Sequence, residues 1–185
     1  MVELDVYDAF SHSSNPNGDW QWGYAATGSA ATLTLLTSYL AVSSDIAAWW
    51  SPVFGSAGAS VTMPQNSASG SRSYGTVTWP ATSISLHPGP GGEHAILRWT
   101  APFAAECVVD LTFQTNDRPS TEVAVYHEGT VVGSVGYLSG ATTVIGVVET
   151  FYVNTGKVLN ISVGPYGSFY YDTTGIHGGL VCTLD

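Results

Sequence analysis

Residues 15–24 read NPNGDWQWGY, a polar turn joined to a segment with large aromatic rings at alternate positions. Alternation with a period of two places these rings on one face of a β-strand. Asn, Pro and Gly in close succession favour a tight turn just before that strand. Two later segments repeat the design, SLHPGPGGEHAILRW at 85–99 and SFYYDTTG at 168–175. The three segments predict strands whose connecting turns present polar groups at the ends of a sheet.

Composition extends this prediction to the whole chain of 185 residues, of which 44% are hydrophobic and only 10% charged. Long helices need charged outer faces, and disordered chains lack this much apolar material. Many short alternating segments separated by turn residues predict an all-β fold, an antiparallel β-sandwich of the jelly-roll type. Because no repeat or linker divides the chain, we expect a single domain over residues 1–185. Within it, residues 51–73 are expected to form a long surface excursion, part of which packs down as a hairpin.

The charge balance excludes several partners. Four Lys and Arg residues stand against fourteen Asp and Glu, a formal net charge of −10. Nucleic-acid binding requires a basic footprint, so we expect no nucleic-acid partner. No apolar run approaches the roughly 20 residues of a membrane-spanning helix, so no membrane insertion is expected. The surplus carboxylates either keep the protein soluble or hold a hard cation such as calcium.

Two features bear on the cellular location. Cys107 and Cys182 both lie in strand-like segments, and a bridge between them would close a loop of 75 residues (182 − 107). In the chain-entropy model such a bridge stabilises the fold by roughly 4 kcal/mol, and disulfides are typical of extracellular proteins. The alternative is a pair of buried thiols that act as small hydrophobic groups. The start, MVELDVYDAF, lacks the regions of a signal peptide, so an extracellular or cell-surface location implies a mature or excised domain, or another export route.

The spaced motifs together resemble those of a family. NPNG-x-W near the start, LHPGP-x-GE followed by RW, and YD-x-TG near the end are similar to motifs of secreted bacterial β-sandwich modules of planctomycete type. The resemblance spans nearly the whole chain. It implies a jelly roll like that of carbohydrate-binding modules, and a polysaccharide or other glycan as partner. The two cysteines, and Lys157 after Gly156 where an Asp is usual, depart from the pattern.

Aromatic side chains supply the candidate glycan-binding residues. Trp20 and Trp22 share a strand face and either fill the core or form an exposed platform on which sugar rings stack. Trp50 follows another tryptophan, and adjacent strand residues point to opposite faces, so it is a candidate for an exposed ring. Tyr170 and Tyr171 lie in a loop-end cluster, and the amphipathic tyrosine ring suits polar ligands.

Two charged residues complete the candidate ligand site. Arg98 and Trp99 occupy successive strand positions, so one is expected inside the sandwich and one outside. Arg98 therefore either contacts the ligand or forms a semi-buried ion pair with Asp117 or Glu93. Asp117 lies in a turn, NDRPS, and is the second charged candidate.

A calcium site is a further hypothesis. Asn15, Asn17 and Asp19 offer oxygens on alternate residues, as in part of a calcium loop, although the complete twelve-residue motif is absent. The alternative is that these side chains cap their own turn. Asp172, near the C-terminus, could join N-terminal oxygens such as Asp19 if the first and last strands are neighbours.

These observations predict a non-catalytic, extracellular carbohydrate-binding module that binds polysaccharide through loop-end aromatics, with calcium in a structural role. The alternative is an assembly subunit of a filament, surface layer or virus-like particle, in which the same aromatics mediate self-association. The sequence contains neither a Gly-x-Ser-x-Gly elbow nor a phosphate-binding Gly-x-x-x-x-Gly-Lys loop. We therefore expect that the protein is not an enzyme.

Overall fold

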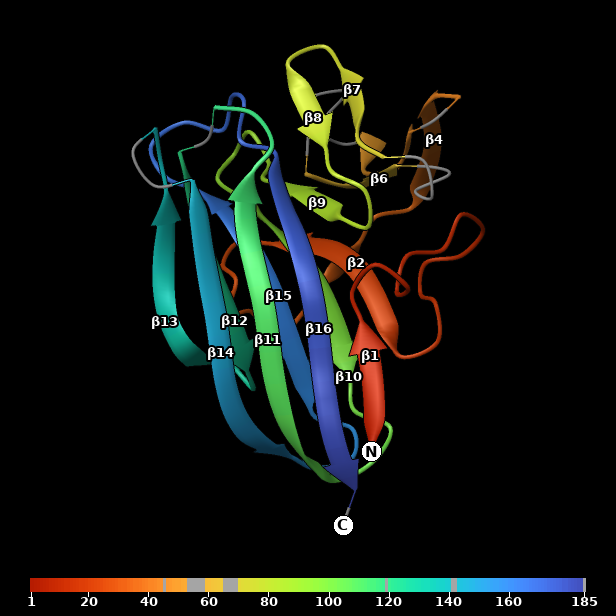
Figure 1. Ribbon diagram of the computed structural model, residues 1–185, viewed down its shortest axis with the longest axis vertical. Helices are drawn as coiled ribbons and strands as arrows, with labels where there is room; N and C mark the ends of the chain where they lie inside the picture. Colours follow the sequence, from red (N-terminus) through yellow and green to blue (C-terminus); the bar gives the residue numbers. More distant parts are fainter. Residues whose placement is uncertain (45, 53–58, 65–69, 119, 141–142, 185) are drawn as a thin grey trace.

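The computed structural model describes residues 1–44, 46–52, 59–64, 70–118, 120–140 and 143–184. In these residues the chain forms antiparallel β-sheets and no α-helix, which confirms the predicted antiparallel β-sandwich of jelly-roll type. Two large sheets face each other, and a small hairpin stands above them (Figure 1). None of the described residues belongs to a helix long and apolar enough to cross a bilayer.

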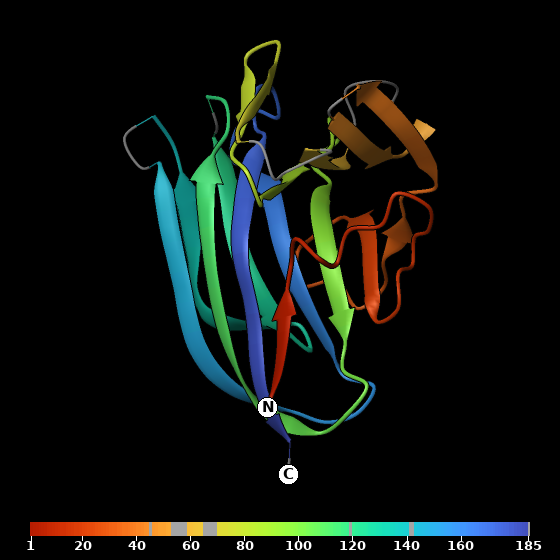
Figure 2. The ribbon, with the colours of Figure 1, turned by 45° about the vertical axis from the view of Figure 1, so that its right-hand side comes forward.

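The larger sheet has eight strands within the described residues. Its order is β14 (Val144–Val153), β11 (Ala105–Thr115), β16 (Thr174–Leu184), β9 (Ile84–His87), β6 (Ser60–Pro64), β5 (Ile46–Trp50) and β4 (Ser38–Ser43), with β1 (Val2–Asp5) also paired to β16. The long strands β14, β11 and β16 lie side by side in front of the second sheet (Figures 1 and 2).

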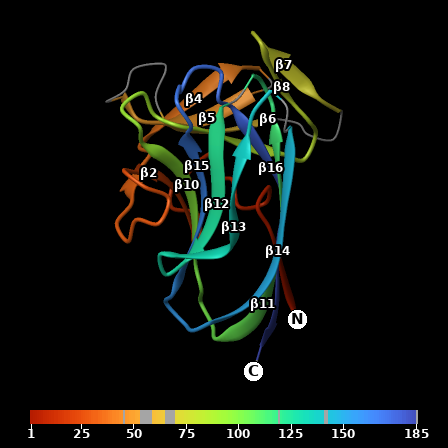
Figure 3. The ribbon, with the colours of Figure 1, turned by 90° about the vertical axis from the view of Figure 1, so that its left-hand side faces the viewer.

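The second sheet has six strands in the same part of the chain. Its order is β13 (Thr130–Leu138), β12 (Thr121–His127), β15 (Val158–Pro165), β10 (His94–Thr100), β2 (Trp20–Ala25) and β3 (Thr34–Leu35). The small hairpin consists of β7 (Arg72–Tyr74) and β8 (Val77–Trp79). From β9 to β16 the chain crosses repeatedly between the two large sheets, so its loops gather at the two ends of the sandwich (Figure 3).

Strand periodicity explains the core. In β11, Cys107, Val109 and Leu111 are buried, whereas Glu106 and Asp110 between them are exposed. This is the alternation expected of a strand with one face on the core and one in solvent. Inward-facing residues from both large sheets join one hydrophobic cluster, which includes Trp22, Leu86, Leu97, Trp99, Phe113, Val125, Leu159, Ile161 and Leu180.

The predicted disulfide is present. Cys107 and Cys182 lie directly opposite each other in the β11–β16 pair, with a Cα–Cα distance of 4.1 Å, and both are fully buried. The bridge therefore links neighbouring strands of one sheet. It closes a loop with a sequence separation of 75 residues, so the chain-entropy contribution of about 4 kcal/mol applies.

The predicted surface excursion over residues 51–73 is wrong for one segment. Residues 60–64 form β6, which pairs with both β5 and β9 inside the larger sheet, and Val61 is fully buried. The Ser-rich and Gly-rich composition concealed a short strand with an inward-facing valine. Part of this segment does pack down, as expected, but as a single strand, β6, whose partners β5 and β9 both lie outside residues 51–73. Residues 53–58 and 65–69, which belong to the same prediction, lie outside the described residues.

Candidate functional site

The turn before β2 is held by its own polar side chains. The Asn15 amide donates to the carbonyls of Trp22 (2.7 Å) and Leu36 (2.8 Å), while its Oδ1 accepts the Trp22 N–H at 2.9 Å. Asn17 donates from Nδ2 to the Ala9 carbonyl at 2.9 Å. The Asn15 side chain thus acts as a partner for β2 at Trp22. Both asparagines have a structural role, but they bind backbone outside the turn and do not cap the turn itself.

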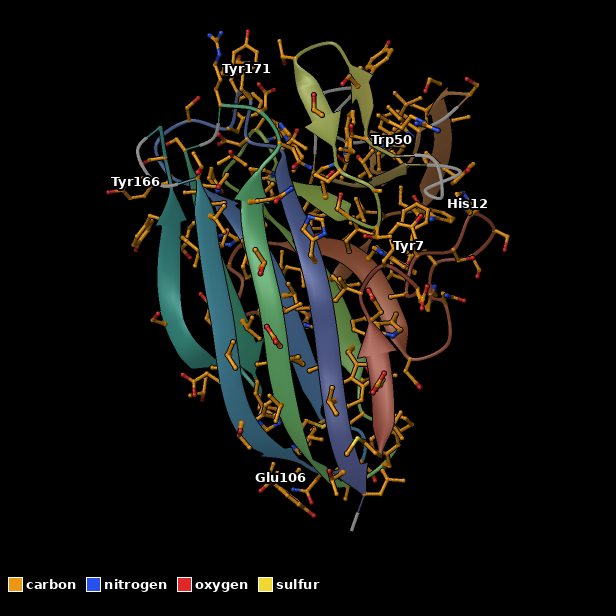
Figure 4. All side chains as sticks on the ribbon, in the orientation of Figure 1. Tyr7, His12, Trp50, Glu106, Tyr166 and Tyr171 are labelled. Carbon is orange, nitrogen blue, oxygen red and sulfur yellow. A yellow bond between two sulfur atoms is a disulfide. The ribbon has the colours of Figure 1, made fainter. Side chains whose placement is uncertain are left out.

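The tryptophans of β2 belong to the core. Trp22 is fully buried and Trp20 is 7% exposed, so neither offers a ring face to a ligand. Their assignment as ligand-binding residues is wrong, because the face that they share is the inner face of the second sheet. Trp50 is half-buried at the end of β5 and lies over the β4–β6 part of the sandwich (Figure 4).

Arg98 is also structural. It is 6% exposed, and its guanidinium donates to Asn160 Oδ1 (2.8 Å) and to the carbonyls of Ala30 (2.7 Å) and Ala31 (3.0 Å). Asn160 donates in turn to the Gly28 carbonyl at 3.0 Å. The pair fastens the segment between β2 and β3 onto the sheet. Both sequence alternatives for Arg98, ligand contact and an ion pair with Asp117 or Glu93, are therefore wrong, since the Asn160 side chain and two backbone carbonyls supply its partners.

Four further candidates, Asp117, Tyr170, Tyr171 and Asp172, lie around Ser120, at the end of the sandwich where β12 begins. The Tyr166 N–H donates to the Ser120 carbonyl at 2.7 Å, and the Ser120 hydroxyl donates to the Tyr166 carbonyl. The Ser120 N–H donates to Asp172 Oδ1 at 2.7 Å. Both ends of the loop at residues 166–172 are thus fixed to one residue, which gives its side chains a defined position.

Tyrosine rings surround this loop. Tyr137, Tyr166, Tyr170 and Tyr171, which we call the tyrosine rim, are 46%, 55%, 64% and 58% exposed. The Tyr137 and Tyr166 rings lie 4.7 Å apart between centroids, although they come from different strands and loops. Tyr170 packs against Phe169, with centroids 4.1 Å apart. Figure 4 shows Tyr166 and Tyr171 projecting outward at this end. The rim therefore presents several aromatic rings on a fixed support.

A hollow adjoins the β11–β12 and β13–β14 loops. It has a volume of about 350 Å³ and is lined by Thr115, Asp117, Arg118, Ser139, Gly140 and Thr143. Asp117 Oδ2 accepts a hydrogen bond from the Thr76 hydroxyl at 2.8 Å, which connects the β7–β8 hairpin to the site. Small-molecule sites commonly have volumes of about 300–1,000 Å³, with a few polar groups that orient the ligand. The hollow offers one anionic, one cationic and several hydroxyl groups.

Asp172 lies beneath the rim. Its side chain is fully buried, and its Oδ2 has no hydrogen-bond partner among the described residues. Burial raises the pKa of Asp172 to about 6; the hydrogen bond from Ser120 opposes this rise, and the nearby Asp117 carboxylate adds to it. The neighbouring hydroxyls of Thr121 and Thr174 are 3.1 Å apart and also buried. Asp172 therefore supports the loop from inside and is covered from solvent.

The two halves of the predicted calcium site lie apart. The Asp19 carbonyl accepts a hydrogen bond from the Thr100 N–H, and Thr100 pairs with Val158 at the start of β15. Asp172 binds Ser120, which precedes Thr121, the partner of Pro165 at the end of β15. Seven residue steps of about 3.3 Å separate these ends by about 23 Å. The prediction that Asp19 and Asp172 share one ion is therefore wrong. In the described part of the chain, no three or more His, Cys, Asp or Glu side chains form a cluster that could hold a metal ion. Calcium at either group alone stays a prediction.

Sequence reasoning missed three residues of this site: Ser120, Tyr137 and Arg118. The sequence could have indicated Tyr137, because strand alternation places it on the face of β13 opposite to that of its buried neighbour Leu138. Ser120 carries none, since its role depends on the meeting of two loops distant in sequence. Of the predicted residues, Asp117, Tyr170, Tyr171 and Asp172 do come together at this end.

Comparisons with known proteins give a partial likeness. No protein-family model matches the sequence, and no curated protein matches it. Among solved structures, CBM51 from Clostridium perfringens GH95, in complex with methyl-galactose, is similar with a TM-score of 0.40 and 14% identity over 57% of this chain and 73% of that chain. Two structures of a β-glucosidase from Kluyveromyces marxianus have TM-scores of 0.30 and 0.29, at 12% and 9% identity, over 56% of this chain and only 11% and 12% of theirs.

Proposed function

We propose that this protein is a non-catalytic carbohydrate-binding module that binds a polysaccharide at the tyrosine rim. The observation that carries the proposal is the set of four exposed tyrosines around a loop whose two ends are fixed to Ser120. Sugar rings present C–H faces that pack on aromatic rings, and tyrosine adds a hydroxyl for hydrogen bonding. Because the loop is fixed, ligand binding costs little ordering entropy.

The neighbouring hollow supplies polar groups to orient a glycan. Asp117 can accept hydrogen bonds from sugar hydroxyls, Arg118 can donate, and Thr115, Ser139 and Thr143 can do both. A combination of apolar ring surface and a few polar groups of both kinds is typical of sites for polyhydroxylated ligands. The geometry thus favours a glycan over a purely apolar ligand.

The burial of Asp172 supports a binding role without catalysis. A glycosidase uses two carboxyl groups that both reach the scissile bond, and one commonly has a raised pKa. Asp172 has a raised pKa and lies near Asp117, but its side chain is fully buried and cannot touch a substrate. The raised pKa thus reflects burial beneath the rim. The disulfide favours an extracellular or cell-surface location.

Retention on insoluble polysaccharides, together with a glycan array covering hexoses, uronic acids and amino sugars, tests the proposal. We expect Tyr170→Ala and Tyr171→Ala each to weaken binding by about tenfold or more, the loss typical of a central aromatic contact. Tyr152→Ala is the matched control, because Tyr152 is 48% exposed on the outer side of β14, away from the rim. An array without any binding would overturn the proposal, as would equal losses in all three variants.

The assembly alternative predicts a different result from the same variants. If rim tyrosines contact a neighbouring copy, size-exclusion chromatography shows polymers that dissociate on Tyr170→Ala, and glycan binding is absent. A monomer that binds glycan supports the module.

A further inference from the structure

The outer side of the larger sheet carries a second concentrated set of exposed groups. Figure 1 looks directly at this side, formed by β14, β11, β16 and β1. We call it the outer face and define it by two sets of side chains. The apolar set is Val108, Val144, Val148, Tyr152 and Val181, and the acidic set is Glu3, Asp5, Glu106 and Asp110. The outer face and the tyrosine rim have no residue in common.

The apolar side chains are neighbours across the strands. Val108 of β11 lies directly opposite Val181 of β16, and they are 37% and 39% exposed. Val148 of β14 is 63% exposed and lies opposite Asp110, one diagonal position from Val108. Diagonal cross-strand neighbours are within reach of each other. Exposed aliphatic groups gathered on a sheet face mark an interaction surface more often than single exposed residues do.

A hollow of about 430 Å³ lies beside these valines. Its lining includes Glu3, Asp5, Asp110, Thr112, His177 and Val181, over the backbone of two glycines in β16. It is large enough to receive side chains of a partner. Figure 4 shows Glu106 at the lower end of the same face.

Charge decides what can occupy this face. The outer face has four carboxylates, whereas the four Lys and Arg residues of the chain lie elsewhere. Arg72 is in β7, Arg98 is buried in β10, and Arg118 is in the β11–β12 loop. Lys157 pairs with Glu128 at 2.9 Å. Burial lowers the pKa of His177, against the opposing effects of a Thr82 backbone hydrogen bond and of Asp5. His177 therefore does not add a cation at neutral pH.

A second copy of this chain is a poor occupant. Its own outer face would bring the same four carboxylates into contact with these, and like charges across an interface cost several kcal/mol. Of the four basic residues that a copy could offer instead, Arg98 is buried and Lys157 is paired with Glu128, which leaves Arg72 and Arg118 against four carboxylates. The complementary partner is a cationic one.

We propose that the outer face is a docking surface for a partner protein that presents Lys or Arg side chains among aliphatic ones. The methylene stems of Lys and Arg pack on Val108, Val148 and Val181, while their charged heads reach Asp5 and Asp110. An amino-sugar polymer would also bring cations, but ring recognition uses flat aromatic faces, and branched aliphatic side chains occupy the centre of this surface. The proposal does not depend on glycan binding at the rim.

The test uses a cyclic β-hairpin peptide with valine and lysine on one face and threonine on the other. Cyclisation lowers the ordering cost of binding. We expect chemical-shift changes at Val108, Val148 and Val181 in NMR titrations, and binding about tenfold weaker to the double variant Asp5→Asn/Asp110→Asn. Asn retains the side-chain oxygen that accepts the Tyr7 N–H in the native protein.

The matched control is Asp19→Asn/Glu122→Gln, which changes the net charge by the same amount away from the outer face. Equal weakening in both double variants would show a general charge effect and overturn the proposal. Unchanged binding of a peptide with serine in place of valine would also overturn it, as would no binding of the original peptide at millimolar concentration. Binding of glucosamine oligomers with the same dependence on Asp5 and Asp110 would replace the protein partner by an amino sugar. Melting temperatures of all variants show whether they are folded.

Discussion

The turn at residues 15–19 and the loop at residues 166–172 each contain a glycine with positive φ and end at an aspartate, yet their side chains lie in different surroundings. In the turn, Asn15 uses both side-chain atoms to bind backbone groups of Trp22 and Leu36. In the loop, Asp172 keeps one oxygen without a partner, and the tyrosines beside it face solvent. The first segment uses its polar side chains to hold backbone, whereas the second buries its carboxylate and exposes its tyrosine rings.

The aromatic residues near the two segments also differ in their exposure to solvent. Trp22 is fully buried and its ring packs edge-on against Phe10, with centroids 5.7 Å apart, while Tyr170 is 64% exposed. Strand alternation explains the tryptophan, because β2 has one face on the core. The loop follows no such alternation, and successive Tyr170 and Tyr171 both face solvent. The backbone of Tyr171 has a φ of +65°, an uncommon value for a non-glycine residue.

The largest expected effect separates these two aromatic groups. Trp22→Ala should reduce the free energy of unfolding by about 4 kcal/mol, since it removes a buried ring and leaves a cavity. Tyr170→Ala should change it by about 0.5 kcal/mol or less, because the ring is exposed. Urea denaturation of both variants measures the difference. Comparable losses of stability would contradict the division between core and rim.

A second prediction concerns the turn itself. Asn15→Ala removes the partner of the Trp22 N–H and the Asn15 bond to the Leu36 carbonyl, while the Trp22 carbonyl still accepts from the Leu36 N–H at 3.0 Å; the free energy of unfolding should fall by about 3 kcal/mol. Asn17→Ala removes a single hydrogen bond to Ala9 and should cost about 1 kcal/mol. Equal effects in denaturation would show that the Asn15 side chain does not act as the strand partner of β2.

The third prediction concerns the pH dependence that Asp172 confers. Its pKa is about 6 in the folded protein and 3.8 as the ordinary value, so the folded state holds the proton more tightly. The free energy of unfolding therefore decreases as the pH rises from about 4 to about 6, and this loss persists above pH 6. Asp172→Asn removes the titration and can still accept the Ser120 N–H.

We expect the stability of Asp172→Asn relative to the native protein to rise by on the order of 1–2 kcal/mol across that pH range. Chemical denaturation at several pH values between 4 and 7 measures the difference. A difference that stays constant with pH would mean that Asp172 is ionised throughout and that the loop is supported in another way.

Much of the fold could be predicted from local patterns. The alternation in β11 and the turns between strands predict the sandwich, and the same alternation places Cys107 on the core side of its strand. Alternation shows that Trp20 and Trp22 share a face, but it cannot show whether that face is covered. Coverage depends on the second sheet, which is distant in sequence.

The site could be predicted only for residues that lie in short turn segments recognisable from the sequence. Tyr170, Tyr171 and Asp117 come from short turn segments that the sequence marks as loop ends. Ser120 escaped notice because its importance arises from hydrogen bonds to residues 46 and 52 positions away. The sequence suggests Asp172 only as a calcium ligand, because its burial depends on the packing of both loops.

The smallest expected effect compares one glycine from each segment. Gly18 has a φ of +56° and Gly167 a φ of +93°, and nothing lies within 4 Å of where a Cβ would be at either position. Gly18→Ala and Gly167→Ala should each cost about 1 kcal/mol of stability, because alanine is strained at positive φ. Their effects on glycan retention should differ: Gly167→Ala reshapes the loop that carries Tyr166 and Tyr170 and should weaken retention several-fold, whereas Gly18→Ala should leave it unchanged. Denaturation and polysaccharide retention on the same preparations separate the two effects. If both variants retain glycan as well as the native protein does, the conformation of the loop does not control the rim, and the contrast between the two segments is one of exposure alone.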